Sequence, residues 1–331
     1  MKNLRKILFP FSIIYYIITT VRNFMYDNGY LKSATFHIPI ICVGNLSVGG
    51  TGKTPMVEYL IRLLADTFQV ATLSRGYKRK SEGFVLANEF TVMEDIGDEP
   101  FQYHSKFKNI HVAVDANRVI GVTNILKQKP DTQVVILDDA FQHRKIKAGF
   151  YILLTSYDEL YFNDCLLPAG NLRESSIGVK RADVVVVTKC PPNLSSAEQQ
   201  NIRSKIKLEN VFFSTIVYDE NISNDSTILN LKAFNDSFVA LAGIAKPQFF
   251  FNYLKCDAMN TLTFPDHHNF TDTDIQTILK QASGRKIITT EKDYMRLQGL
   301  IPQEQLFYLP IKTEFLNNSN TFNTCIKRFV N

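Results

Sequence analysis

Short, continuously apolar runs alternate with helix-like segments through the first two thirds of the chain. Runs of this kind are typical of parallel strands that helices cover on both faces, whereas half-exposed strands alternate apolar and polar residues. Amphipathic segments at 54–68 and 116–128 separate several of the runs. The pattern predicts an α/β domain with a mostly parallel sheet and right-handed crossovers. The predicted strands are Ile38–Val43, Gln69–Leu73, Ile110–Val114, Val134–Leu137, Phe150–Leu154 and Asp183–Val187.

A polar, turn-rich segment at 191–235 interrupts this alternation, and a second series of strand-like and helix-like patterns begins at Phe238. The second series is long enough for a small packed unit. We place the boundary within 215–235 and predict a first domain over 29–225 and a smaller α/β domain over 226–331. Strands are expected within 238–245, 261–264, 286–291 and 306–310, and helices at 247–256 and 271–282.

Residues 1–28 are basic and apolar and predict a separate helix. The apolar run Ile7–Val21 could be a signal peptide, a membrane-spanning helix, an interfacial anchor or a core helix. No small-residue cleavage site follows it, it is shorter than the roughly 20 residues that span a bilayer, and Pro10 interrupts it. The basic and aromatic flanks favour a helix lying in the headgroup region of an anionic leaflet. Packing on the protein's own core stays the alternative.

The charge distribution supports this view of the N-terminus. The 331 residues carry a net charge of +5, and four basic residues precede the first acidic one. The remainder is nearly neutral, so no nucleic-acid-binding face is expected. The five cysteines form no C-x-x-C pair, which favours a reducing compartment and argues against a disulfide framework or a zinc site. The four basic residues are Lys2, Arg5, Lys6 and Arg22.

Residues 38–55 (IPIICVGNLSVGGTGKTP) predict a phosphate-binding P-loop between a strand and a helix. Glycines permit torsions that turn successive N–H groups toward phosphate oxygens, and the following helix adds its positive end. Lys53 is predicted to reach the β/γ-phosphates and Thr54 to bind Mg²⁺. Ser47 stands where the strict pattern has glycine, and an ordinary glycine-rich turn is the alternative. The predicted cradle comprises Gly49, Gly50, Thr51, Gly52, Lys53 and Thr54.

Acidic residues occur at two further points. Asp138 and Asp139 end an apolar strand, where carboxylates face the ligand crevice of an open α/β sheet. Beside a P-loop they are predicted Mg²⁺ ligands, with a solvated turn as the alternative. Asp98, in the sequence GDEP, either caps a helix or accepts a hydroxyl proton during phosphoryl transfer.

Polar residues at other predicted loops are candidates for phosphate or sugar contact, although a surface ion pair would explain some of them. Thr188 and Pro191 stand where a guanine-reading strand end has Asn and Asp, which favours ATP over GTP. In the second domain His267 and His268 follow a carboxylate. Adjacent histidines point apart, so one imidazole acting with a carboxylate is preferred to a zinc site. The contact candidates are Arg75, Arg118, Gln142, Asn171, Arg173 and Glu174.

Taken together, nine segments resemble the tetraacyldisaccharide 4′-kinase family, the lipid A kinases of Gram-negative bacteria. They fall in the family's order between residues 44 and 293. One departure is Ala140, where the family often has glycine. The segments are GNLSVGGTGKTP, LSRGY, GDEP, DDAFQHR, LPAGNLRE, VTK, GIAKP, FPDHHNF and TEKD.

The resemblance implies transfer of the ATP γ-phosphate to the 4′-hydroxyl of a tetraacylated glucosamine disaccharide 1-phosphate, with Mg²⁺ as cofactor. It implies Asp98 as the base, assisted by His267, and a second domain that closes over the site. It places the protein at the cytoplasmic face of the inner membrane, with no obligate protein partner. The rival hypothesis is a membrane-anchored P-loop ATPase that works as a nucleotide switch and recruits a protein partner.

Overall fold

The computed structural model describes residues 5–224, 226–233, 237–266 and 268–331, which form two compact units. The first comprises Met1–Ile216 and Thr313–Asn331, and the second Val217–Lys312. The second unit therefore differs from the predicted range 226–331, because the C-terminal residues return to the first unit. There β15 (Ile311–Phe315) lies next to β8 (Val211–Tyr218), and α11 (Ser319–Val330) adds buried side chains to the core.

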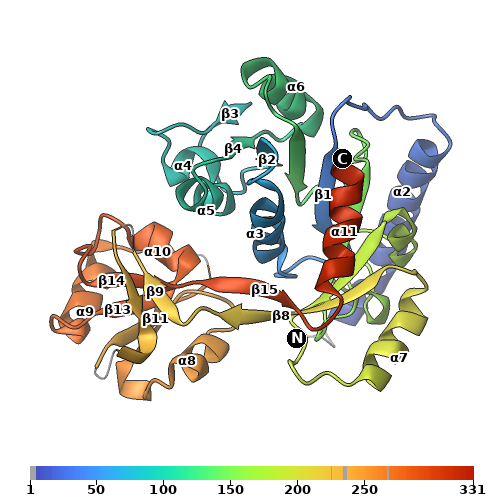
Figure 1. Ribbon diagram of the computed structural model, residues 1–331. Helices are drawn as coiled ribbons and strands as arrows, with labels where there is room; N and C mark the ends of the chain where they lie inside the picture. Colours follow the sequence, from blue (N-terminus) through green and yellow to red (C-terminus); the bar gives the residue numbers. More distant parts are fainter. Residues whose placement is uncertain (1–4, 225, 234–236, 267) are drawn as a thin grey trace. The chain divides into compact units, whose positions relative to one another are not determined.

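Within the described residues, the sheet of the first unit has nine strands in the order β15-β8-β7-β6-β1-β5-β2-β4-β3 (Figure 1). Parallel pairing runs from β8 through β4, and β3 joins antiparallel. This confirms the predicted mostly parallel α/β sheet. The remaining strands are β1 (Ile40–Asn45), β2 (Val70–Ser74), β3 (Val85–Leu86), β4 (His111–Val114), β5 (Val134–Asp138), β6 (Phe150–Ser156) and β7 (Val184–Thr188).

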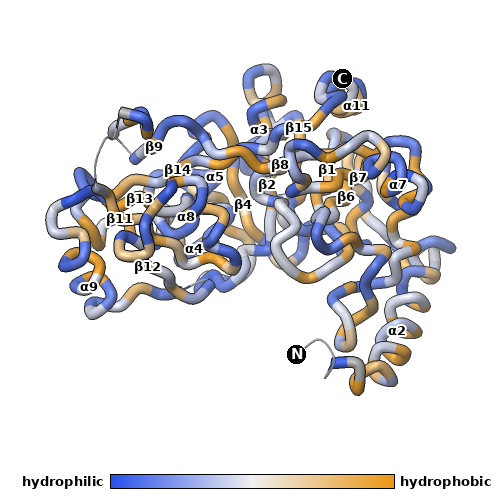
Figure 2. The backbone as a smooth tube through the Cα atoms, turned by 90° about the horizontal axis from the view of Figure 1, so that it is seen from below, coloured by the Kyte–Doolittle hydropathy of each residue, from blue (hydrophilic) through white to orange (hydrophobic). Residues whose placement is uncertain are grey.

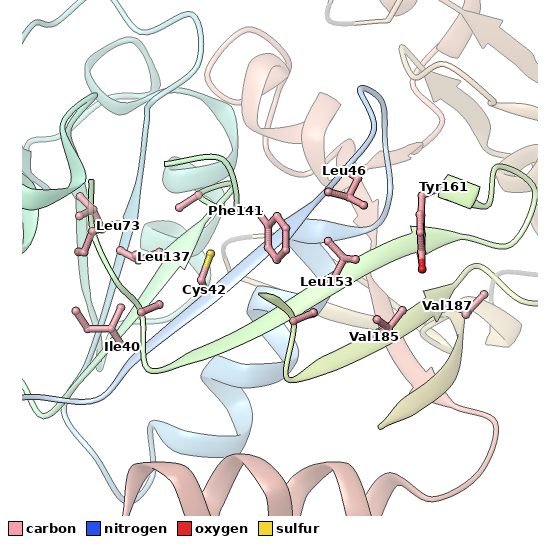
Figure 3. Packing of buried hydrophobic residues seen from close by; sticks show 14 of the residues in the cluster. Ile40, Cys42, Leu46, Leu73, Leu137, Phe141, Leu153, Tyr161, Val185 and Val187 are labelled. Carbon is pink, nitrogen blue, oxygen red and sulfur yellow. The ribbon is translucent and has the colours of Figure 1, made fainter. Parts of the chain in front are cut away.

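Helices cover both faces of this sheet, which explains the unbroken apolar runs. In β1, Ile41 and Val43 join the cluster that α3, α5 and α11 cover, while Ile40 and Cys42 join the cluster beneath α6 and α7. Figure 3 shows part of the cluster beneath α6 and α7, with Phe141 packed over β1. The helices of this unit are α2 (Phe9–Asp27), α3 (Lys53–Leu64), α4 (Met93–Ile96), α5 (Asp98–Lys106), α6 (Arg118–Gln128), α7 (Ser196–Ile206) and α11.

The second unit is a smaller α/β layer. In the described part of the chain its sheet has the order β10-β9-β14-β13-β11-β12, parallel from β14 to β12 and antiparallel at β9 and β10. Its strands are β9 (Asn221–Ser223), β10 (Ile228–Asn230), β11 (Val239–Ala242), β12 (Thr261–Thr263), β13 (Ile287–Thr290) and β14 (Leu306–Leu309). Its helices are α8 (Gln248–Leu254), α9 (Asp272–Ala282) and α10 (Glu291–Leu297). It also has two short 3₁₀ helices, η4 (Leu231–Ala233) and η5 (Ala258–Asn260), and those of the first unit are η1 (Lys6–Leu8), η2 (Tyr161–Asn163) and η3 (Ser176–Arg181).

Helix α2 turns its polar side toward the protein and its apolar side outward. Ser12 and Thr19 are its buried residues, whereas Phe11, Ile14 and Ile18 are more than half exposed. Figure 2 shows the hydrophobic positions along this helix. Pro10 lies in the first turn, where a missing N–H costs no hydrogen bond, so it begins the helix and does not interrupt it. Over the described residues, no helix is both long and apolar enough to cross a bilayer.

Polar contacts hold α2 to the loop at 164–174. Ser12 Oγ donates to the Leu166 carbonyl at 3.1 Å and accepts from the Ala169 N–H at 3.1 Å. Tyr15 donates to the Arg173 carbonyl at 2.8 Å. The core-helix alternative therefore does not describe this helix, because its apolar side faces away from the core.

Candidate active site

The P-loop connects β1 to α3 as predicted. Gly52 caps α3 in the left-handed region, with φ of 82°, and Gly49 has φ of 114°. A residue with a Cβ is strained at such positive φ values, so these torsions favour glycine. Ser47 instead forms an isolated bridge with Leu172, and its side chain is buried. Serine is therefore tolerated there because the left-handed torsions of this loop lie elsewhere.

Two neighbouring segments brace the P-loop backbone. Thr188, at the end of β7, donates to the Thr51 carbonyl at 2.8 Å, and Lys189 donates to the Gly50 carbonyl at 2.6 Å. From the other side, the Val48 N–H donates to the Asn171 carbonyl at 2.8 Å. Thr188 was compared above with a nucleotide-reading residue, and its hydroxyl lies against the phosphate loop. The loop is thus held in shape before any ligand binds.

Asp138 ends β5 and is almost completely buried. Its Oδ2 accepts a hydrogen bond from Tyr103 at 3.1 Å, while Oδ1 has no partner among the described residues. Burial raises the pKa of this carboxyl to about 6, against the opposing effect of the Lys53 ammonium. An orphaned buried oxygen beside a P-loop fits a cation ligand.

Asp139 differs from Asp138 in its partners. Its Oδ1 lies 3.7 Å from Lys53 Nζ and accepts from Arg173 Nη1 at 2.9 Å. Burial alone would raise the pKa of Asp139, but Lys53 and Arg173 outweigh it and hold the pKa below its usual value. The residue has a φ of 50°, and the following Ala140, the departure from the family pattern, is not in that region. Asp139 thus pairs with the side chains of Lys53 and Arg173, whereas Asp138 has one oxygen without a partner among the described residues.

Three of the predicted contact residues form internal networks. Arg118 is 3% exposed, and its guanidinium donates to the backbone carbonyls of Asp138 and Asp139 at 3.4 Å. Gln142 donates to Glu174 Oε1 at 2.9 Å, and Glu174 is fully buried. These side chains thus bond to one another and to the backbone at the ends of β1 and β5. Their contact with phosphate or sugar stays a prediction.

The other three contact candidates are all at least partly exposed. Arg75 is exposed at the end of β2. Arg173 is partly exposed and paired with Asp139, and Asn171 accepts from Arg5 Nη1 at 2.9 Å. Of the six candidates, Arg75 and Arg173 are thus the ones whose charged groups can meet a ligand without rearrangement of the core.

Asp98 is the first residue of α5 and is partly buried. Gly97, before it, has φ of 88°, and a Cβ there would lie 2.8 Å from the Tyr77 carbonyl oxygen. Two side chains of α5 bind Glu58 on α3: Gln102 Nε2 and Lys106 Nζ each lie 2.7 Å from a carboxylate oxygen. The helix that carries Asp98 is thereby fixed to the helix that follows the P-loop.

His267 lies outside the described residues. Its neighbour His268 places Nε2 3.0 Å from Asp274 Oδ2 and stacks on Phe264, with ring centroids 5.0 Å apart. His268 is thus engaged at the start of α9, within the second unit.

Sequence reasoning missed Tyr103 and Glu58. A charged residue within the apolar run of α3 was a signal for Glu58, because a buried carboxylate needs partners. Nothing in the sequence distinguished Tyr103 from a core aromatic residue.

Comparison with known proteins agrees with this geometry. The family model described as tetraacyldisaccharide-1-P 4′-kinase matches residues 4–331. The chain belongs to this family. The resemblance inferred from the motifs is thereby confirmed.

Relatives in the tetraacyldisaccharide 4′-kinase family match along the whole chain. The tetraacyldisaccharide 4′-kinase of Flavobacterium johnsoniae is 57% identical over 334 residues, covering 100% of this chain and 98% of the relative. That of Bacteroides thetaiotaomicron is 44% identical, covering 99% and 93%. A crystal structure described as the apo form of LpxK from Aquifex aeolicus in complex with ATP superimposes with a TM-score of 0.81 at 32% identity, covering 99% of this chain and all of that one.

Proposed function

We propose that this protein transfers the γ-phosphate of ATP to the 4′-hydroxyl of a tetraacyldisaccharide 1-phosphate, which yields lipid IVA. The observation that carries the proposal is the meeting of a P-loop with Asp138, a buried carboxylate with one unpaired oxygen. Family membership supports the acceptor, and the ATP complex of the Aquifex relative supports the donor.

Lys53 and the backbone N–H groups of 49–54 hold the β- and γ-phosphates in this proposal. Mg²⁺ is usually held by one or two protein oxygens together with phosphate oxygens. Thr54 and Asp138 fit that donor set, and Asp139 serves the site indirectly by holding Lys53 and Arg173. Bound there, the cation would neutralise charge on the phosphates.

Asp98 is proposed to accept the proton of the acceptor hydroxyl. Its position at the start of a helix anchored to α3 keeps the carboxylate in a fixed place, which general-base catalysis requires. Assistance by His267 and closure of the smaller domain remain predictions from the resemblance. Arg75 and Arg173 are the proposed contacts for anionic groups of the substrates.

The outward apolar side of α2 is proposed to lie on the cytoplasmic leaflet of the inner membrane. Exposed apolar side chains that line one side of a helix partition into the boundary between headgroups and acyl chains. An acceptor with four acyl chains resides in that boundary. The helix thus brings the enzyme to the surface that contains its substrate.

The test is transfer of labelled phosphate from ATP to the acylated disaccharide in detergent micelles. Lys53→Ala and Asp98→Asn are each expected to lower kcat by about 10² or more, because each removes a group that acts on the transferring phosphoryl or the hydroxyl. Lys127→Ala, an exposed lysine at the end of α6, is the matched control and should keep full activity. A fully active Asp98→Asn variant would exclude Asp98 as the general base. ATP hydrolysis that is independent of the lipid would favour the nucleotide-switch hypothesis instead.

A further inference from the structure

A phenol lies between the two residues proposed to hold Mg²⁺. Tyr103, on α5, is completely buried. Its hydroxyl donates to Asp138 Oδ2 at 3.1 Å. The Thr54 hydroxyl lowers the pKa of this phenol against the effect of burial, as a donor facing the phenol oxygen does. A phenol has one proton, and Tyr103 uses it in the hydrogen bond to Asp138, so a Thr54 hydroxyl that bonds Tyr103 acts as the donor. In this arrangement the hydrogen bonds run from Thr54 through Tyr103 to Asp138.

This direction sets the lone pairs of both outer residues. A hydroxyl that offers a lone pair to a cation must direct its proton to another acceptor, and the Tyr103 oxygen is the acceptor for the Thr54 hydroxyl in this arrangement. At the other end Tyr103 occupies Oδ2 of Asp138 and leaves Oδ1, which has no partner among the described residues. Both residues thus keep an oxygen available for the metal and have their other hydrogen-bonding capacity satisfied.

The phenol cannot easily move away, because α5 is fixed on either side of it in the sequence. Gln102 and Lys106 both bind Glu58 on α3, at 2.7 Å each. Glu58 is 1% exposed, and the Tyr103 ring belongs to the apolar cluster under the sheet. Side chains that orient metal ligands act in this way, through rotamers locked by packing.

We propose that Tyr103 is a positioning residue that orients Thr54 and Asp138 for Mg²⁺. The inference rests on the proposed function, because that function assigns the metal to these two residues. Tyr103 itself touches neither the substrates nor the metal in this scheme. It acts by fixing the hydrogen-bond directions of the two ligands.

The test compares Tyr103→Phe with Tyr161→Phe, a matched control that removes another buried phenol of the first unit. Calorimetry measures the affinity for a non-hydrolysable ATP analogue at a series of Mg²⁺ concentrations. In Tyr103→Phe the Mg²⁺ concentration that gives half of the affinity gain should rise about tenfold or more, the usual effect of losing such a partner. Tyr161→Phe should match the wild type. In turnover assays, high Mg²⁺ should restore most of the kcat of Tyr103→Phe.

Other results would overturn the inference. A Tyr103→Phe variant that melts at a lower temperature but keeps the wild-type Mg²⁺ dependence would show a packing role only. A loss of kcat that high Mg²⁺ does not restore would show that Tyr103 does not act through the metal. If the wild type itself binds the analogue equally well without Mg²⁺, the proposed metal site fails, and the inference fails with it. The wild-type titration therefore distinguishes the two failures.

Discussion

Replacing Glu58 with glutamine removes a buried negative charge that three donors share. Arg62, Gln102 and Lys106 each approach a carboxylate oxygen of Glu58 to 2.7 Å. The side chain of Glu58 is 1% exposed, that of Lys106 is 17% exposed and that of Arg62 is 36% exposed. Glutamine keeps the shape of the residue but has one acceptor oxygen and no charge.

The cost can be estimated from the burial of each partner. Arg62 can turn toward water, so its pair with Glu58 contributes little. Lys106 and Gln102 stay largely buried, and removing one member of a buried pair costs about 3–5 kcal/mol. Because the remaining oxygen can still accept one bond, we expect the lower end, about 3 kcal/mol. For a unit of this size that corresponds to a fall in Tm of roughly 6–12 °C.

Thermal and urea unfolding of the purified protein measure this change. Asp27→Asn is the control, because it makes the same change from carboxylate to amide in an ion pair whose acid is 57% exposed. The control should lose no more than about 1 kcal/mol. If Glu58→Gln also loses less than about 1 kcal/mol, the network does not hold α5 to α3, and the reasoning is refuted.

Two further predictions concern α2 and His143. The double variant Ile14→Ser, Ile18→Ser should bind anionic vesicles at least about tenfold more weakly. Each isoleucine that is buried in the membrane contributes about 1.5–3 kcal/mol to binding. The Tm of this variant should stay unchanged. Ser12→Ala should do the reverse, because it removes a hydrogen bond to the loop but no apolar side chain: it should lose about 1 kcal/mol of stability and keep its vesicle binding. Sedimentation with vesicles measures the binding. Undiminished binding by the double variant would contradict the docking role of α2. Burial and then Arg118 lower the pKa of His143 to about 4. The unfolded chain takes up this proton near pH 6.5 and the folded protein only near pH 4, so stability is full above pH 6.5 and falls by about 1–2 kcal/mol toward pH 4 after allowance for solvent. Urea unfolding at a series of pH values should show a shallower fall in His143→Gln, and parallel curves for the two proteins would exclude His143.

Local patterns predicted the individual elements well. Buried parallel strands and the P-loop are encoded in short stretches, so β1 at Ile40–Asn45 and β5 at Val134–Asp138 lie within two residues of the prediction. The return of Thr313–Asn331 to the first unit could not be predicted in this way. The apolar period of α11 indicates a helix, but it does not say which sheet the helix covers.

The same limit applies to the site. The sequence shows which residue types follow each strand, but it does not show whether a side chain faces the ligand or another side chain. Arg118 and Glu174 are charged residues that were predicted to contact phosphate or sugar, yet both are buried in bonds to their neighbours. Conversely, Tyr103 resembles an ordinary core aromatic residue in the sequence, but its hydroxyl donates to Asp138, a proposed metal ligand. Such directions come from the three-dimensional packing of α5 and β5.

The inside-out orientation of α2 has a consequence for how its sequence can drift. In an ordinary surface helix the inner side chains are constrained by shape and the outer ones are free to vary among polar residues. Here the inner residues, such as Ser12 and Tyr15, are constrained by hydrogen-bond geometry toward particular carbonyls. Acyl chains are fluid and impose no shape, so if α2 rests on lipid, its outer side can exchange isoleucine, phenylalanine and leucine freely. Selection would then preserve the polar residues of this helix by identity and its apolar residues only by character.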